Sequence, residues 1–258
     1  MKEIEELWKR ALEEAWNPYK INIEKDAEDW VKFNDEQKKY LADLFFHQLL
    51  GEYEVLTGVS ILINFIKEKD ARLFLQTHAR DNTVHANIFE RFLLCVGEKD
   101  FTNLKERVSR SYYELVYIKP RALLNELEKY YDEEKIVKFM TLYYLATDGI
   151  LYNTSYIALD QLIFSNKLLK NLNEAYKKIN IDEKRQTMFA AYYIKYLSEQ
   201  NKELVNVVRD TLNDSTQLII STIGYFSNLA ESFGRSIDEF ASLAQGVIDD
   251  ELKVIGLK

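Results

Sequence analysis

Apolar residues recur along this chain at the spacing of a buried helix face. Between residues 34 and 67 one such stripe reads Leu41, Phe45, Gln48, Glu52, Val55, Val59, Leu62 and Ile66. Similar stripes run through residues 70 to 97, 133 to 164 and 181 to 211. Because positions three and four apart share one side of a helix, the pattern predicts four long helices, one pair in each half of the chain. Two such pairs predict a four-helix bundle core with additional helices.

Local signals mark where several helices begin and end. An amphipathic segment over residues 1 to 16 stops before Pro18, because proline disfavours helix in the residue that precedes it. Asn34 followed by Gln37 predicts a capping box at the start of the first long helix. Gly97 predicts the end of the second long helix.

The rest of the chain is expected to carry shorter helices. Helical pieces are predicted between residues 101 and 131, interrupted by Pro120, and two more helices are predicted after residue 211. Neither a linker of biased composition nor a tandem repeat divides the chain. Residues 1 to 258 are therefore expected to form a single domain.

Composition supports an all-α fold. The chain has only 8 Gly and 2 Pro, too few for the turns of a sheet protein, and 47% hydrophobic residues for a large core. The net charge of -8 argues against a nucleic-acid partner. Cys95 is the single cysteine, which rules out an internal disulfide. The longest apolar run, GVSILINFI, is far too short to span a membrane, and a signal core is not visible, so we expect a cytoplasmic protein with no membrane span.

Polar residues interrupt each of the four stripes near its centre. They are Glu52 on the first stripe, Asn82 and His85 on the second, Asp148 on the third, and Glu183 and Gln186 on the fourth. Each half of the chain thus presents one acid and one polar pair spaced i, i+3. Because an unpaired buried carboxylate is energetically costly, three of them in a core indicate a shared cation or hydrogen-bonding partners. A hydrogen-bonded core histidine and a helix irregularity at Asp148-Gly149 are the alternatives for individual residues.

Five blocks of sequence carry a resemblance to a known family. They are AWNPYKINI (residues 15 to 23), GEYEV (51 to 55), LFLQTHARDNTVHANIF (73 to 89), YYLATDGILYNTSY (143 to 156) and IDEKRQTMF (181 to 189). In these blocks the chain resembles the ribonucleotide-reductase-small-subunit-like ligand-binding oxidases of the ferritin-like superfamily. The resemblance implies a ferritin-like four-helix bundle that binds Fe, Mn or both between its helices.

The resemblance also implies a set of metal ligands. The six ligands of the family fall on Glu52, Asn82, His85, Asp148, Glu183 and Gln186. Three positions depart from the pattern, because Asn82 replaces a bridging glutamate, Asp148 a glutamate and Gln186 a histidine. One metal position keeps two carboxylates and an imidazole, whereas the other is left without imidazole. Three carboxylates against two divalent cations leave a net charge of plus one. We therefore expect one firmly held metal ion and a second that is weak or missing.

Three further residues are implied beside the metals as catalytic. The family forms a tyrosine–valine ether crosslink by reaction with dioxygen, and its partners fall on Tyr143 and Val55. Tyr156 matches another tyrosine near the family's site. Tyr143 precedes Asp148 by five residues, which is about 140° around an ideal α-helix, so helical spacing alone does not select it. Ordinary core packing is the alternative for all three.

Other polar residues near the stripes have supporting or undecided roles. Asp81 and Asp182 match acids that hold the ligand histidines in orientation. His78 lies one turn before Asn82 and is either a displaced ligand or a hydrogen-bonded core histidine. It is about 10 Å along the helix axis from His85, too far for one shared ion. His47 lies off the face of Glu52 and is expected to be unrelated to the metal site.

The leading functional prediction is oxidase chemistry with dioxygen on a long-chain, fatty-acid-like ligand, in a homodimer. One alternative is a ligand-binding or scaffold protein without redox activity, and another is a mononuclear metalloenzyme with changed chemistry. Phe89 stands one turn after His85, where the true reductase subunit carries its radical tyrosine. This substitution argues against nucleotide reduction.

Overall fold

The computed structural model describes residues 1–236 and 246, and the statements below concern these residues. Its α-helices are α1 (Lys2–Glu13), α2 (Ala27–Trp30), α3 (Asp35–Leu62), α4 (Lys69–Cys95), α5 (Arg110–Tyr113), α6 (Lys119–Leu127), α7 (Glu133–Met140), α8 (Asn153–Leu162), α9 (Lys170–Gln200), α10 (Leu204–Tyr225) and α11 (Ser227–Ser232). Two segments are π-helical, η4 (Glu114–Ile118) and η5 (Thr141–Tyr152). The described part contains no strand, which confirms the all-α prediction. That residues 1 to 258 form a single domain stays a prediction.

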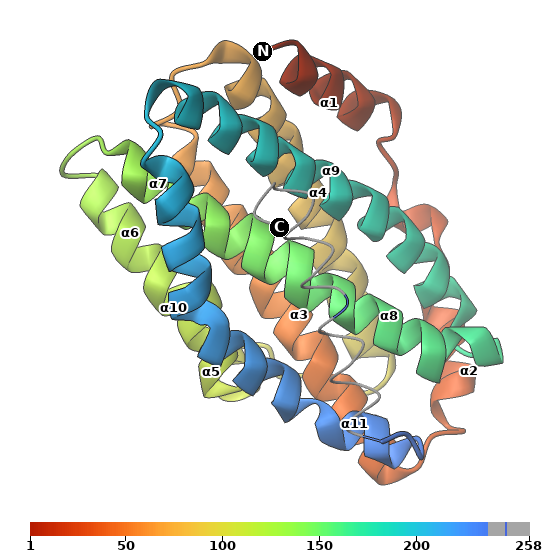
Figure 1. Cartoon of the computed structure of the whole chain (residues 1–258). Coiled ribbons are helices and arrows are strands. Elements are labelled where there is room, and N and C mark those ends of the chain that lie inside the picture. Colours follow the sequence, from red (N-terminus) through yellow and green to blue (C-terminus); the bar gives the residue numbers. More distant parts are fainter. Residues whose placement is uncertain (237–245, 247–258) are drawn as a thin grey trace.

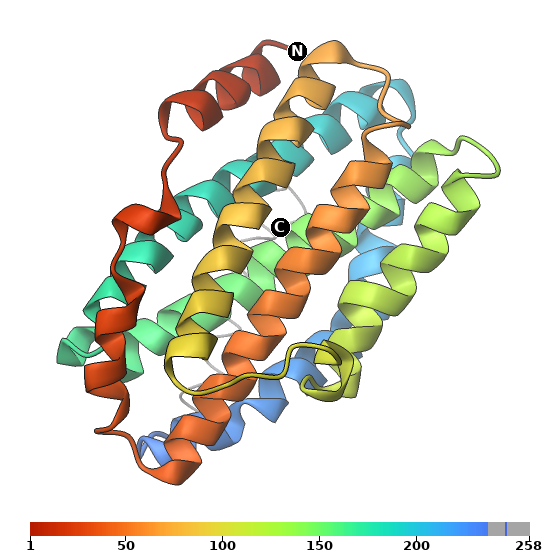
Figure 2. The ribbon, with the colours of Figure 1, turned by 180° about the vertical axis from the view of Figure 1, so that it is seen from behind.

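Four long helical rods form the core of the fold (Figure 1). They are α3, α4, α9 and the continuous run of α7, η5 and α8. α3 packs along α4, and η5 packs against α9, so each half of the chain supplies one pair. α10 lies across α7 and η5, while α1 covers α4 and α9 (Figure 2). This is the predicted four-helix core with additional helices.

The predicted signals at the ends of the long helices are observed. The Asn34 side chain accepts a hydrogen bond from the Gln37 backbone N–H at 2.9 Å, and the Gln37 side chain accepts one from the Asn34 N–H at 3.0 Å. This reciprocal capping box satisfies two N–H groups that otherwise lack partners at the start of α3. Gly97 has a φ of 103° just after α4, a left-handed conformation that favours glycine.

The predicted bounds of the last long helix were wrong. The structure has α9 over Lys170–Gln200, followed by α10 from Leu204, instead of one helix over 181 to 211. The buried stripe in fact begins earlier, because Leu172, Tyr176 and other apolar residues of the preceding segment continue it. The segment KNLNEAYKKI is therefore the first part of α9.

The predicted interruption at Pro120 was also wrong. α5, η4 and α6 follow one another without a break, and Pro120 lies in the first turn of α6. Proline is tolerated at that place because the first N–H groups of a helix do not take part in its hydrogen-bond ladder. In addition, α3 ends at Leu62 rather than near residue 67.

The third rod is continuous but not uniformly α-helical. η5 covers the twelve residues Thr141–Tyr152, all of them buried, between α7 and α8. Because π-helical hydrogen bonds join residues five apart, side chains at i and i+5 lie close to one side of the rod. The irregularity considered at Asp148-Gly149 is therefore real and extends well beyond these two residues.

The apolar core consists of two clusters with polar residues between them. One cluster contains Val55, Phe74 and Phe189, and the other contains Phe45 and Phe92. The polar residues singled out in the four stripes belong to neither cluster and lie at the intervening level of the bundle. Within the described residues, the helices are too short or too polar to cross a membrane.

Candidate metal centre

Three side chains from three helices converge between the two core clusters. His85 Nδ1 on α4 lies 3.3 Å from Glu52 Oε1 on α3 and 3.1 Å from Glu183 Oε1 on α9. All three residues are buried, and one ligand atom from each lies within 4.8 Å of the others. The His85 Nδ1 atom makes no hydrogen bond of good geometry, although both carboxylates are near. Converging donor atoms that do not satisfy one another fit a bound cation.

Electrostatics at this cluster favours an additional positive charge. Burial, partly offset by the charge of His85, raises the pKa of Glu52 to about 7. Burial and the negative charges of Glu183 and Glu52 raise the pKa of Asp148 well above its usual range. Burial alone would lower the pKa of His85, but the Glu52 charge and the hydrogen bond with Asp182 raise it well above 6.5. A divalent cation would replace the protons that these groups otherwise retain.

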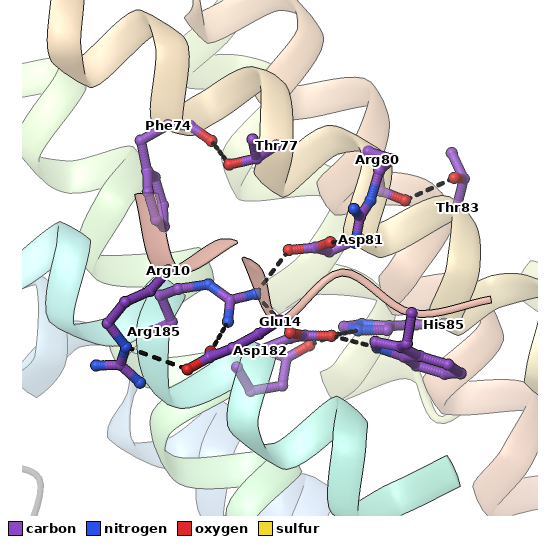
Figure 3. Close-up of polar contacts among 12 residues, drawn as sticks. Arg10, Glu14, Phe74, Thr77, Arg80, Asp81, Thr83, His85, Asp182 and Arg185 are labelled. Carbon is purple, nitrogen blue, oxygen red and sulfur yellow. Dashed lines mark hydrogen bonds and ion pairs between the residues drawn. The ribbon is translucent and has the colours of Figure 1, made fainter. Parts of the chain in front are cut away.

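His85 is held from its other side by a buried ionic network (Figure 3). His85 Nε2 lies 3.2 Å from Asp182 Oδ2, which also accepts a hydrogen bond from Trp16 Nε1 at 2.8 Å. Since a carboxylate only accepts, Nε2 carries the proton and Nδ1 faces the two glutamates. This geometry agrees with the supporting role expected for Asp182.

Arg185 is the part of this network that sequence reasoning missed. Its guanidinium is 1% exposed and donates to Asp182, to Asp81 at 3.0 Å and to Glu14 at 2.6 Å. Asp81 contacts Arg185 and Arg80 rather than an imidazole, and the histidine that it would be expected to hold is absent from this chain. The sequence did contain a signal for this network, because Arg185 follows Asp182 by three residues on a buried stripe, where a cation needs an acidic partner.

The remaining predicted ligands carry buried polar atoms that have no hydrogen-bond partner in the described part of the chain. Asn82 Oδ1, Asp148 Oδ2 and both side-chain amide atoms of Gln186 are buried and lack a hydrogen-bond partner among the described residues. Asn82 and Asp148 line the same cavity as Glu52 and Glu183, whereas Gln186 does not. The cavity lining thus includes four of the predicted ligands, His85 contacts two of them, Glu52 and Glu183, and Gln186 is buried outside the lining. Free amide and carboxylate oxygens suit a second, weaker cation position.

The other two histidines have hydrogen-bonding roles. His78 Nδ1 lies 2.9 Å from the Tyr144 hydroxyl, and burial lowers the pKa of His78 to about 3, so the ring is neutral. This contact supports the interpretation of His78 as a core histidine. His47 is 2.7 Å from the Asp43 carbonyl through Nδ1 and accepts the Ser109 N–H through Nε2 at 2.8 Å. Both of its nitrogens are therefore engaged away from the cluster.

The three predicted catalytic residues lie at different distances from the cavity. Val55 is buried and lines it. The Tyr143 hydroxyl lies outside the lining, within hydrogen-bonding distance of the Glu54 carbonyl at 3.1 Å and the Val116 carbonyl at 3.0 Å. Its ring is therefore adjacent to the segment that carries Val55, and the π-helix explains how a residue five positions before Asp148 approaches the same side. Tyr156 is half-buried and stacks on Tyr176, also outside the lining.

A cavity of about 70 Å³ extends from the carboxylate cluster to α10 and α11. Its polar end contains Glu52, Asp148 and Glu183, and the Tyr112 side chain of α5 also borders it. The rest of the lining is mostly apolar and includes Leu44, Leu151, Ile223, Phe226 and Leu229. A lining that combines carboxylates with apolar side chains fits an amphipathic molecule. Tyr112 belongs to no recognised block, so sequence reasoning had no signal for it.

Comparison with known proteins decides the family. A family profile described as "Ribonucleotide reductase, small chain" matches residues 1–258. This chain belongs to the ribonucleotide reductase small-chain family. The predicted relationship is thereby confirmed.

Solved structures extend this small-chain family assignment to the fold. An R2-like ligand-binding oxidase with an aerobically reconstituted Mn/Fe cofactor (long soak) matches with a TM-score of 0.89 at 20% identity, over 98% of this chain and 92% of that chain. An R2-like ligand-binding oxidase with an aerobically reconstituted metal cofactor after photoconversion matches with a TM-score of 0.89 at 20% identity, over 99% and 94% of the two chains. The predicted ferritin-like bundle is therefore confirmed. Within that bundle this chain places Glu52, His85 and Glu183 in a group suited to a metal ion.

Proposed function

We propose that this protein is a metal-dependent oxidase that binds a long-chain, fatty-acid-like molecule beside its metal and reacts with dioxygen. The observation that carries the proposal is that Glu52 and Glu183, the two carboxylates of the Glu52, His85 and Glu183 cluster, line a cavity whose remaining lining is mostly apolar. The matched structures of ligand-binding oxidases with Mn/Fe or metal cofactors support it. We propose a homodimer as the working form, because the family resemblance implies one.

The donor set suits Fe or Mn at one position. Glu52, His85 and Glu183 would hold the first ion through two carboxylates and one imidazole. Asp148 and the Asn82 amide would contribute to a weaker second position. When bound, the metal would supply the one-electron redox steps and dioxygen activation that side chains lack.

The protein's own residues would bind and orient the reactants. Asp182 keeps the proton of His85 on Nε2, so that Nδ1 stays available next to Glu52 and Glu183. The charge count of plus one for two divalent ions favours an anionic head group at the polar end, while the apolar end excludes water and accepts a hydrocarbon chain. A crosslink between Tyr143 and Val55 is part of the proposal, and the Tyr143 hydroxyl lies next to the Val55 segment.

A second candidate function is ligand binding without redox chemistry. The observation that favours it is the pair of neutral amides, Asn82 and Gln186, in place of a carboxylate and a histidine. Amide oxygens hold a first-row metal less firmly than the groups that they replace. A protein with one ion or none could still bind the same class of ligand in the cavity, and a mononuclear metalloenzyme is the intermediate case.

Metal content and mass separate these functions. The protein is purified from cells supplied with Fe and Mn, and its metal is measured by elemental analysis. We expect one firmly bound ion per chain with a substoichiometric second, and a protein without metal under these conditions would contradict the oxidase proposal. Intact mass after aerobic reconstitution should fall by two hydrogens, and Tyr143→Phe should abolish the loss. An unchanged mass with metal bound would favour the binding protein.

A further inference from the structure

The phenol of Tyr112 reaches the polar end of the cavity by crossing over Gly51. A methyl group built on Gly51 would lie 2.3 Å from the Tyr112 hydroxyl oxygen and 3.6 Å from its Cζ atom. The first separation is far below van der Waals contact, whereas the second is ordinary contact. Gly51 is therefore the residue that lets this hydroxyl approach α3 directly before Glu52.

The position of Tyr112 is built into the fold. The Ser109 N–H donates to His47 on α3 at 2.8 Å, and the Ser109 side chain accepts the Tyr112 N–H at 3.3 Å, capping α5. The His47 ring packs against the Tyr112 ring with their centroids 4.9 Å apart. His47 and Gly51 are four residues apart and lie on one face of α3, so one face both holds α5 and admits its phenol.

This hydroxyl is a hydrogen-bond donor without a protein acceptor. Within the described residues the Tyr112 hydroxyl makes no hydrogen bond, although the residue is only 6% exposed and borders the cavity. Burial, and then the negative charges of Glu52 and Asp148, raise the pKa of Tyr112 well above 10, so the proton stays on the oxygen. The hydroxyl is open to the cavity, so water or a molecule bound there can accept its hydrogen bond.

We propose that Tyr112 donates a hydrogen bond to the anionic head group of the cavity ligand and thereby selects carboxylates over uncharged chains of the same length. The inference rests on the proposed function, because it assumes a long-chain ligand with its head at the metal end. Gly51 acts through Tyr112 as a positioning residue. His47 acts in the same way through Ser109.

The ligand part is tested by calorimetric titration of the Mn(II)-loaded protein with dodecanoate and with 1-dodecanol. Tyr112→Phe keeps the ring and removes the donor, so the affinity for dodecanoate should fall roughly 10- to 100-fold, as for a lost hydrogen bond to a charged group. The affinity for 1-dodecanol should change much less. Tyr113→Phe is the matched control, because it removes a hydroxyl from the neighbouring residue, which stacks on Tyr117 and does not line the cavity.

The geometric part is tested by melting temperature without any ligand. Gly51→Ala should lower the melting temperature of the wild type, because the added methyl group meets the hydroxyl. The same change in a Tyr112→Phe background should raise it, because the nearest remaining atom is at contact distance and alanine favours helix over glycine. A decrease of equal size in both backgrounds would contradict the close approach and overturn the inference.

The experiments distinguish failure of the Tyr112 hydrogen bond from failure of the proposed function. If the wild type binds dodecanoate and Tyr112→Phe binds it equally well, the proposed Tyr112 hydrogen bond is wrong while the proposed ligand class stands. If the Mn(II)-loaded wild type does not bind dodecanoate, both the proposed ligand class and the proposed Tyr112 hydrogen bond are wrong. A selective loss of dodecanoate affinity in Tyr112→Phe, with Tyr113→Phe unchanged, establishes the inference.

Discussion

Replacing Arg185 with methionine should reveal how strongly the buried ionic network stabilises the protein. Arg185 is 1% exposed, and it pairs with Asp81 at 3.0 Å and with Asp182, which are 1% and 1% exposed. Methionine fills a similar volume but leaves both carboxylates without this cation. Breaking a buried pair by removing one partner costs about 3–5 kcal/mol, because the remaining charge is uncompensated.

The contacts that survive place the expected loss at the low end of that range. Asp182 keeps the His85 and Trp16 contacts, and Asp81 keeps Arg80. The third partner, Glu14, has a 35% exposed side chain, and such pairs contribute less than about 1 kcal/mol. We expect a loss of about 3 kcal/mol in the free energy of unfolding, or a melting temperature lower by about 6–12 °C for a protein of this size.

Urea unfolding followed by circular dichroism measures the loss. Lys138→Met is the matched control, because Lys138 lies 2.6 Å from Glu134 in a pair that is largely exposed, and its removal should cost less than about 1 kcal/mol. The difference in the free energy of unfolding between Arg185→Met and the wild type should also become smaller as pH falls. Burial already raises the pKa of Asp81, whereas the pKa of Asp182 lies below its usual value. Loss of the cation raises both pKa values, so protonation at low pH restores part of the stability that the variant lacks. Equal losses in the two variants would refute the reasoning.

Four further outcomes follow from the site. His85→Ala should abolish the firmly bound metal in elemental analysis, and metal retained at wild-type stoichiometry would contradict the ligand role. Gln186→His should move the metal content from one ion towards two per chain, whereas an unchanged value would show that Gln186 does not limit the second position. Asp182→Asn should weaken metal binding by about 10- to 100-fold, measured by competition with a chelator, since it releases the His85 orientation; wild-type affinity would contradict that role. Burial lowers the pKa of His47 to about 4 from 6.5, so its contribution to stability is complete above pH 6.5 and is lost as pH falls towards 4. His47→Gln cannot titrate and should lack this part of the loss in urea unfolding, and the same pH dependence in both proteins would exclude His47 as its source.

The parts of the fold that could be predicted are those that depend on neighbours in the sequence. The Asn34 capping box involves residues three apart, and Gly97 adopts its left-handed φ within one turn of the helix end. The stripes assigned Glu52, His85 and Glu183 to inward faces correctly, because helical spacing alone determines the face of a residue. Since a bundle turns all its apolar faces inward, polar residues at the centres of the stripes had to meet.

The parts that could not be predicted depend on a change of helical register or on a partner distant in the sequence. The π-helix of η5 makes the angle between Tyr143 and Asp148 smaller than the roughly 140° of ideal α-helical spacing, and the sequence carried no signal for this change. The division into α9 and α10 was misplaced, because the apolar residues Leu172 and Tyr176 were not joined to the stripe that continues after residue 181.

By itself the sequence determined the helical class, the inward faces and the chemical types of the residues at the centre, including the two neutral amides Asn82 and Gln186. Only the tertiary structure decided which atoms meet. A stripe defines rotation about a helix axis but not how far one helix slides along another, and that offset places Arg185 beside Asp81. The same offset between α5 and α3 brings the Tyr112 hydroxyl over Gly51, two residues that share no motif and are joined only by packing.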